Sequence, residues 1–253
     1  MAASPSISTA LVPFSYASPF ADALQLPERL ITIGGRSFTL RQAWAPGGRG
    51  GTGRGDGAQA MGFGASVYAC ALVLAHHVCV AAPALIRGRS VVELGAGLAL
   101  ASLAAAAHGA SRVVATDGDP EVLALAAAAA ARNGVAEGPA FSVRRLRWGA
   151  ADDVEAGADT VLAADVVAAP YAQSLRALAD TVELLLPPAT GGGGVFVLAY
   201  QRRGAEEDAF FADMERRRWV REEVARDELL ADFREPQRGA QPVRVFVFRR
   251  GER

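Results

Sequence analysis

The sequence predicts an α/β fold: a Rossmann-like, doubly wound sheet of about seven mostly parallel strands, with an antiparallel last strand. Apolar runs of strand length alternate with alanine- and leucine-rich stretches of helix length from residue 61 onward. Residues 91–117 supply a complete strand–turn–helix–strand unit with glycines in its first turn. A chain of 253 residues, 51% of them apolar, is long enough to bury one such core.

A β-hairpin is expected before this domain. Residues 29–43 contain two alternating β-rich runs on either side of Gly34 and Gly35, which is a turn signal. Residues 46–57 are rich in glycine and predict a flexible loop. The first residues lack a secretory pattern, so we expect a disordered tail, with an organellar transit segment as the alternative. The expected organisation is a tail at 1–28, the hairpin and loop at 29–60, and one domain at 61–253.

The elements of the domain follow in chain order. A helix over residues 66–80 leads into a strand at 90–94. Beyond the glycine-rich unit, Asp119 is a typical N-cap and Pro120 a typical first helical residue, so the next helix runs on to Arg132. Later strands are expected at residues 141–146, 160–165, 195–200, 219–224 and 243–248, and later helices at 171–186 and 205–217. The last two strands have no helical connection and are expected to pair antiparallel.

Two cysteines and two adjacent histidines lie on the first expected helix. Cys70 and Cys79 are nine positions apart and point to opposite faces, so we expect two free buried thiols in a reducing, cytoplasmic setting. His76 and His77 diverge around the helix, and no metal site is expected there. These histidines and Pro83 interrupt the apolar run, which therefore predicts a core helix and not a membrane span.

The glycine-rich turn at residues 93–100 points to a class of ligand. Gly95 and Gly97 match the first two glycines of a dinucleotide fingerprint, but Leu100 occupies the place of the third. Glu93 precedes the turn, and a carboxylate there suits an ammonium group better than a diphosphate. Asp117 ends the second strand 22 residues beyond Gly95, where an acid binds ribose hydroxyls. S-Adenosylmethionine has a ribose and an ammonium but no phosphate. The alternative is a tight turn without a ligand.

Three later residues suit the same ligand and its chemistry. Trp148 follows the third strand of the domain, where its indole is expected beside the adenine or in the core. Asp165 ends the fourth strand, at the edge where an acceptor amine would meet a methyl group, and a helix N-cap is its alternative role. Tyr171 comes shortly after and offers a phenol. Methyl transfer from a sulfonium needs alignment, dry surroundings and a group that orients the amine, so neither a protein nucleophile nor a metal is expected.

With these residues in place, the sequence resembles the seven-β-strand methyltransferases of family 16, many of which methylate protein lysines. The resemblance covers residues 61–211 and includes the segments GASVYACALVLA, VVELGAGLAL, VVATDGDPEVL, RWG, AADVV, LAYQRR and DAFF. It implies that Tyr68 replaces an aromatic residue, usually Trp, that contacts the cofactor. It also implies cofactor contacts for Glu93, Gly95, Gly97, Asp117 and Trp148, and identifies Asp165 with the strand-four acid of the family.

The chain departs from the family pattern after the fourth strand. Many members have D-x-x-Y there, whereas Ala168 occupies the tyrosine position in DVVAAPY. Either the loop is rearranged so that Tyr171 supplies the phenol, or the substrate or activity differs. Tyr200 and Arg202 match a further family feature and are expected to line the acceptor channel or to form an ordinary strand end.

The sequence therefore predicts an S-adenosylmethionine-dependent methyltransferase that acts on a protein lysine by direct in-line transfer. Asp165 and Tyr171 are the expected catalytic residues, and Asp165 also belongs to the expected cofactor site. The alternatives are a small-molecule or RNA acceptor, or a catalytically weak protein that binds the cofactor. The net charge of −1 predicts neither specific nucleic-acid binding nor membrane attachment. All 26 basic residues are arginine, so no side chain of the chain itself is a lysine acceptor. We expect a monomer.

Overall fold

A seven-stranded sheet forms the centre of the structure, a computed structural model that describes residues 26–43, 62–150, 153, 157–187, 193–205, 207–233 and 241–251. The strand order is β5-β4-β3-β6-β7-β9-β8. The strands are β3 (Ser90–Leu94), β4 (Arg112–Asp117), β5 (Phe141–Arg145), β6 (Thr160–Ala164), β7 (Val195–Gln201), β8 (Trp219–Glu223) and β9 (Val243–Arg250). The predicted doubly wound fold is confirmed.

Strand directions explain where a ligand can reach the backbone. Strands β3 to β7 are parallel, and β9 lies antiparallel between β7 and β8. The strand order reverses at β3, whose neighbours are β4 on one side and β6 on the other. In open α/β sheets the crevice beyond the carboxyl ends of the strands at such a point is the usual ligand site.

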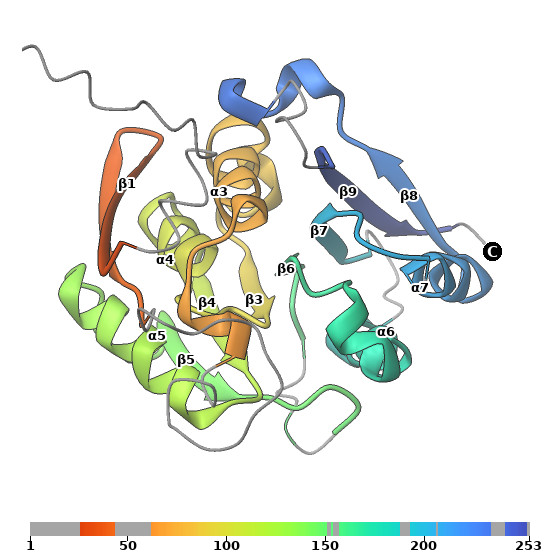
Figure 1. The fold of residues 1–253 in the computed structure, drawn as a ribbon, viewed down its shortest axis with the longest axis horizontal. Coiled ribbons are helices and arrows are strands. Elements are labelled where there is room, and N and C mark those ends of the chain that lie inside the picture. The colour runs from red at the N-terminus through yellow and green to blue at the C-terminus, as the bar shows by residue number, and fades with distance from the viewer. Residues whose placement is uncertain are drawn as a thin grey trace, which may run out of the picture.

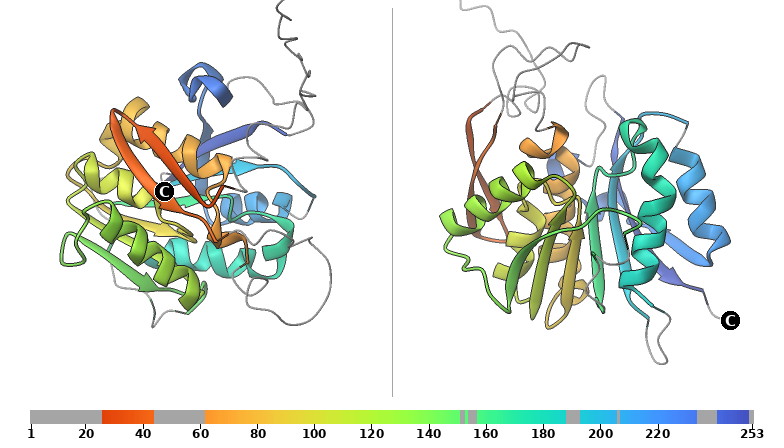
Figure 2. Two further views of the ribbon diagram at one scale, coloured as in Figure 1. Left: turned by 60° about the vertical axis from the view of Figure 1, so that its left-hand side comes forward. Right: turned by 90° about the horizontal axis from the view of Figure 1, so that it is seen from below.

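Helices cover both faces of the sheet (Figures 1 and 2). They are α3 (Ala69–His76), α4 (Leu100–Ala107), α5 (Pro120–Arg132), α6 (Leu175–Leu185) and α7 (Glu207–Arg216). The first three share one hydrophobic core with one face of the sheet, and α6 and α7 share a second core with the other face. Successive residues of β3 alternate between these cores: Val91 belongs to the first and Val92 to the second.

Helix α5 begins and ends where the sequence predicts. The Asp119 side chain accepts a hydrogen bond from the Glu121 N–H at 2.8 Å, and Pro120 is the first helical residue. Asn133 closes the helix, and Gly134 follows with a φ of 71°.

The helix expected at residues 66–80 and the strand expected at 160–165 differ in detail from the predictions. The helix begins at Ala69, later than expected, and continues as a π-helical turn, His77–Ala81. A 3-10 turn that starts at Pro83 follows it, because a proline there cannot continue the hydrogen-bonding pattern. Strand β6 ends at Ala164 because Asp165 takes a φ of 61°, which leaves the extended conformation.

The expected helix at residues 171–186 also starts later than predicted. Its first part is a 3-10 helix, Ala169–Ser174, and regular α-helix begins at Leu175. The 3-10 helix carries a proline in its first turn, where no helical N–H is needed. The 3-10 helix is therefore a separate short element between β6 and α6.

The predicted hairpin is present and packs on the domain. Strands β1 (Glu28–Ile33) and β2 (Arg36–Arg41) pair antiparallel around Gly34 and Gly35, both with positive φ. One face of the hairpin enters the first core, and β2 contacts α4 and α5 (Figure 2). The flexible loop predicted at 46–57 and the tail up to residue 25 lie outside the described residues.

Cys70 and Cys79 are both free and buried, as predicted. Among the described residues, no helix is both long enough and apolar enough to cross a membrane.

Candidate active site

The candidate site lies beyond the carboxyl ends of β3, β4 and β6. The turn after β3 contains two glycines in the left-handed region, Gly95 with a φ of 64° and Gly97 with a φ of 53°. A Cβ at Gly95 would lie 2.8 Å from Val166 Cγ1 and 3.6 Å from the Trp148 ring. A Cβ at Gly97 would lie 2.9 Å from the Gly64 carbonyl oxygen. Both positions therefore require glycine for conformation and for space.

Glu93, the residue before this turn, is fully enclosed. Its side chain is 2% exposed, and its Oε2 accepts hydrogen bonds from the Ser102 N–H at 2.8 Å and from the Ser102 hydroxyl at 2.5 Å. Ser102 lies in the first turn of α4, whose N–H groups lack partners within the helix. Burial raises the pKa of Glu93 to about 7, although the bonds from Ser102 act in the opposite direction. The carboxylate thus joins β3 to the start of α4.

Asp117 ends β4 on the other side of the glycine turn. It accepts hydrogen bonds from the Gly97 N–H at 3.2 Å and from the Asp119 N–H at 3.1 Å, and it remains half-buried. Burial raises its pKa, and the backbone N–H donors oppose that rise. The carboxylate is thereby fixed in direction beside the turn.

Aromatic side chains line the same edge. The rings of Trp148 and Tyr171 meet edge to face, with centroids 5.7 Å apart and an interplanar angle of 70°. Both rings are half-buried, as is Tyr68 at the start of α3. Burial is the main cause that raises the pKa of Tyr171 to about 12, and the charges of Asp117 and Asp165 contribute. The phenol of Tyr171 is therefore poorly solvated, and the charges of both carboxylates act on it.

Asp165 carries the feature that sequence reasoning missed. Its carboxylate receives two parallel hydrogen bonds from the Arg203 guanidinium, one of them 2.6 Å from Nη2 to Oδ2. Burial raises the pKa of the Cys70 thiol well above its usual value, and the nearby charge of Asp165 contributes to this rise. The adjacent 3-10 helix begins after Ala168 without a side-chain cap, so Asp165 is not a helix N-cap.

Tyr200 and Arg202, at the end of β7, have separate roles. Tyr200 is 1% exposed, and its hydroxyl donates to Glu207 Oε2 at 2.6 Å inside the core. Arg202 pairs with Asp208 on the surface through bonds of 2.7 and 2.8 Å. Both match an ordinary strand end, whereas Arg203, the next residue, turns toward Asp165.

The sequence does contain a signal for the Arg203 contact. Strands β6 and β7 are parallel neighbours, so the residues that follow their carboxyl ends meet at one edge of the sheet. An acid after one strand and two arginines after the next predict an ion pair. The choice between the two arginines depends on how the chain leaves β7.

The loop after β6 contains both Ala168, at the tyrosine position of the D-x-x-Y pattern, and Tyr171. Ala168 is 4% exposed, and its neighbours Val166 and Val167 are buried as well. Tyr171 lies on the short helix beyond it and contacts Trp148. The phenol of Tyr171 thus lies beside Trp148, three residues beyond the tyrosine position of the pattern.

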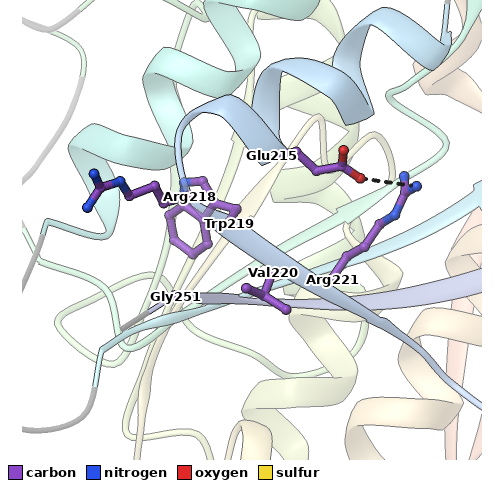
Figure 3. A pocket seen from close by; sticks show the side chains of 6 residues that line it. All are labelled: Glu215, Arg218, Trp219, Val220, Arg221 and Gly251. Atoms are coloured by element: carbon purple, nitrogen blue, oxygen red, sulfur yellow. Dashed lines mark ion pairs between the residues drawn. The ribbon is translucent and has the colours of Figure 1, made fainter. Parts of the chain in front are cut away.

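A surface hollow lies elsewhere (Figure 3). Trp219 pairs with Arg250 at the end of β9, so the start of β8 lies at the sheet edge opposite Asp165. The side chains around it come from the end of α7 and from β8 and β9: Glu215, Arg218, Trp219, Val220, Arg221 and Gly251. An ion pair of 3.4 Å joins Arg221 to Glu215 across it. The described residues contain no cluster of three or more potential metal ligands at either edge.

Known proteins share this sequence pattern. The ribosomal protein L11 methyltransferase of Yersinia pseudotuberculosis serotype O:1b (strain IP 31758) is 35% identical over 145 residues, or 54% of this chain and 45% of that protein. The enzyme of the same name from Pelotomaculum thermopropionicum is 41% identical over 95 residues, or 36% of this chain and 30% of that protein. The chain thus spans less than half of the length of these relatives.

Solved structures share the fold. A ribosomal protein L11 methylase from Lactobacillus delbrueckii subsp. bulgaricus superposes with a TM-score of 0.50 at 17% identity, over 71% of this chain and 77% of that one. An rRNA methylase from Streptococcus thermophilus gives a TM-score of 0.50 at 12% identity, over 70% of this chain and 96% of that one. At such identities the likeness concerns the fold alone.

The family model of the lysine methyltransferases matches residues 56–217, which include every residue of the candidate site. This match identifies S-adenosylmethionine as the cofactor. The chain belongs to the lysine methyltransferase family.

Proposed function

We propose that the chain transfers a methyl group from S-adenosylmethionine to a lysine side chain of a protein. One observation carries the proposal: Asp165, at the end of β6, lies beside the residues that border the glycine turn. Val166, its neighbour, touches the turn at Gly95, and the Trp148 ring borders the same glycine. An acid that can orient an amine and a turn that admits a cofactor therefore share one edge of the sheet.

The residues at the turn suit this cofactor. Gly95 and Gly97 give the turn its left-handed backbone, and Asp117 offers a fixed carboxylate for the ribose hydroxyls. Trp148, with Tyr171 against its ring, gives an aromatic wall for the adenine. Tyr68 would close the site from the start of α3. The negative charges of Glu93 and Asp117 would attract the ammonium of the methionine part. Because Glu93 Oε2 accepts from the Ser102 N–H, Glu93 would also hold the first turn of α4 in place beside the ligand.

The chemistry requires little beyond geometry. S-Adenosylmethionine supplies a methyl group on a sulfonium, which leaves as a neutral thioether. An unprotonated acceptor amine uses its lone pair to form the new bond to carbon while the bond from carbon to sulfur breaks. The chain has to align the amine and exclude water. Asp165 would orient the amine by accepting its N–H, and the half-buried Tyr171 would limit access of water.

A protein acceptor agrees with the family and with the relatives, which are named for a ribosomal protein. The rRNA methylase among the structural neighbours has the same fold, so the fold itself does not select protein over RNA. A ribosomal protein is the first acceptor to test. A cytoplasmic location and a monomeric state stay predictions.

The cofactor site is tested by calorimetric titration with S-adenosylhomocysteine. Asp117→Ala should weaken binding by about ten- to hundredfold, because one charged hydrogen-bond acceptor is lost. Asp159→Ala is the matched control: its carboxylate accepts from the Ser90 N–H at 2.8 Å at the opposite end of the strands, so binding should be unchanged. Equal binding by Asp117→Ala and the wild type would exclude Asp117 from the site.

The acceptor is tested by incubation with radiolabelled S-adenosylmethionine and a cell extract, with and without ribosomal proteins. Because the chain contains no lysine, labelled methyl-lysine cannot come from its own side chains. We expect label in methyl-lysine after hydrolysis of one acceptor protein. Asp165→Asn should bind the cofactor and lose most of this label, while Asp159→Ala should keep it. Label in RNA, or no label at all, would contradict the proposed acceptor.

A further inference from the structure

Arg203 forms an ion pair with Asp165, the residue proposed to orient the acceptor amine. We propose that Arg203 is a positioning residue for methyl transfer: it fixes the direction of Asp165 and balances its charge, so that an acceptor amine is oriented there without being held as an ammonium. This inference rests on the proposed function and names a residue that acts through Asp165. Its basis is the two-pronged contact between the guanidinium and the carboxylate.

Both partners of the pair are held by other groups. The Arg203 N–H contacts both carboxylate oxygens of Glu207 at 3.1 Å. Glu207 is 0% exposed and is fixed in turn by the Tyr200 hydroxyl at 2.6 Å. On the other strand, the Asp165 N–H donates to the Ala199 carbonyl at 2.9 Å, with Asp165 in the left-handed region. These backbone hydrogen bonds hold the two side chains next to each other without a ligand.

The groups around the pair experience both charges. Its charges act on the pKa values of Tyr68, Cys70 and Tyr171, and the charge of Asp117 also acts on Tyr171. On each of the first three groups Asp165 raises the pKa and Arg203 lowers it. Burial is the largest cause of the raised pKa in all three. The neighbourhood is thus poorly solvated, and the ion pair acts on it with opposing signs.

An amine in this neighbourhood must be neutral to accept the methyl group. Poor solvation lowers the pKa of an amine, which favours the reactive form. A carboxylate within about 4–6 Å, without a cation beside it, would raise the pKa of the amine by about 1–3 units. Each unit would lower the fraction of neutral amine about tenfold. Arg203 reduces this effect, while the Asp165 oxygens still accept an N–H from the amine. The side chain of Arg203 is 37% exposed, so its charge also faces the solvent side from which an acceptor protein approaches.

The test measures rates of label transfer between pH 6.5 and pH 9.5, with the protein that the wild type labels in the extract as acceptor. The wild-type rate should level off within this range. Arg203→Met should be about tenfold slower at neutral pH and should level off at least one pH unit higher. Dividing the variant rate by the wild-type rate at each pH cancels effects of pH on the acceptor and the cofactor. Arg203→Lys keeps the charge but not the two-pronged contact, so it should level off at the wild-type pH with a rate between those of Arg203→Met and the wild type.

Two controls separate positioning from a general loss of structure. Arg202→Met breaks the comparable surface pair with Asp208 and should keep the wild-type profile. Calorimetry with S-adenosylhomocysteine, which has no charge on sulfur, should give the same affinity for Arg203→Met and the wild type. A slower Arg203→Met whose rate is lower by the same factor at every pH would overturn the inference and leave the proposed function intact. A wild type that labels no lysine would instead overturn the proposed function.

Discussion

Glu93 borders the glycine turn and also stabilises the fold, because it joins β3 to the start of α4. The sequence predicts that this acid contacts the cofactor, and in the structure its Oε2 accepts hydrogen bonds from Ser102 in the first turn of α4. A carboxylate at the positive end of a helix is favourable, but its complete burial removes the water that would solvate the charge. The raised pKa of about 7 follows from that balance.

The free chain should therefore lose stability as pH rises from about 5 to 8. Between the pKa of an unfolded glutamate and the folded pKa of about 7, the folded state binds more protons, so the free energy of unfolding falls as pH increases. The difference amounts to at most about 3 kcal/mol. Glu93→Gln, which keeps an acceptor for Ser102, should lack this fall in urea unfolding at pH 5.5 and pH 8. The exposed Glu121→Gln should behave like the wild type, and an unchanged pH dependence in Glu93→Gln would refute the assignment.

At the scale of elements, one arginine joins the two helices on the second face of the sheet. Arg217 follows α7 and pairs with Asp180 and Glu183 of α6, at 2.6 and 2.8 Å, and with Asp213 of α7 at 2.9 Å. Its side chain is only 16% exposed. Arg250, the last residue of β9, completes the contact by pairing with Glu183 at 2.9 Å. The position of α6 and α7 relative to the sheet edge depends on this set of charges.

Arg217→Met should destabilise the fold by about 2 kcal/mol, because three carboxylates would lose their shared cation in a partly buried space. Arg216→Met is the matched control, since Arg216 is 73% exposed and makes a single bond of 2.9 Å to Asp213. Its cost should stay within about 0.5 kcal/mol. Urea unfolding at low and high salt measures both variants, and the effect of Arg217→Met should shrink at high salt. Equal effects of the two variants would show that the cluster does not stabilise the helix pair.

At the scale of the whole molecule, the N-terminal hairpin is part of the core. Ile33, Phe38 and Leu40 are 2%, 3% and 0% exposed and pack with α4 and α5. The outer edge of β2 is closed by Asn133, the residue that ends α5. Its Oδ1 accepts from the Thr39 N–H at 2.8 Å, and its Nδ2 donates to the Thr39 carbonyl at 3.0 Å. One side chain thus ends a helix and pairs a strand 94 residues away.

Asn133→Ala should release the hairpin from α5. The Thr39 backbone groups would lose both partners, at a cost of about 1–2 kcal/mol, and the β2 amides should exchange with solvent faster. Hydrogen exchange read by mass spectrometry measures this directly. Ser37→Ala removes only the exposed hydroxyl contact with Thr32 at 2.9 Å and should leave exchange in β2 unchanged. Unchanged protection in Asn133→Ala would show that apolar packing alone holds the hairpin.

The sequence by itself determined the parts of the protein that depend on local patterning. Apolar runs located the seven strands, Asp119 and Pro120 located the start of α5, and the spacing of Glu93, Gly95, Gly97 and Asp117 indicated the ligand class. These signals are readable because each one lies within a single element or a single turn.

Only the tertiary structure decided which side chains meet across elements. Asp165 and Arg203 are 38 residues apart, and their pairing depends on the left-handed turn at Asp165 and on the bend after β7. The contact between Glu93 and Ser102, and the place that Tyr171 takes beside Trp148, depend likewise on loop paths that no local pattern specifies. Side-chain contacts across a sheet edge are set by backbone direction and burial together, and both appear only when the whole core is packed.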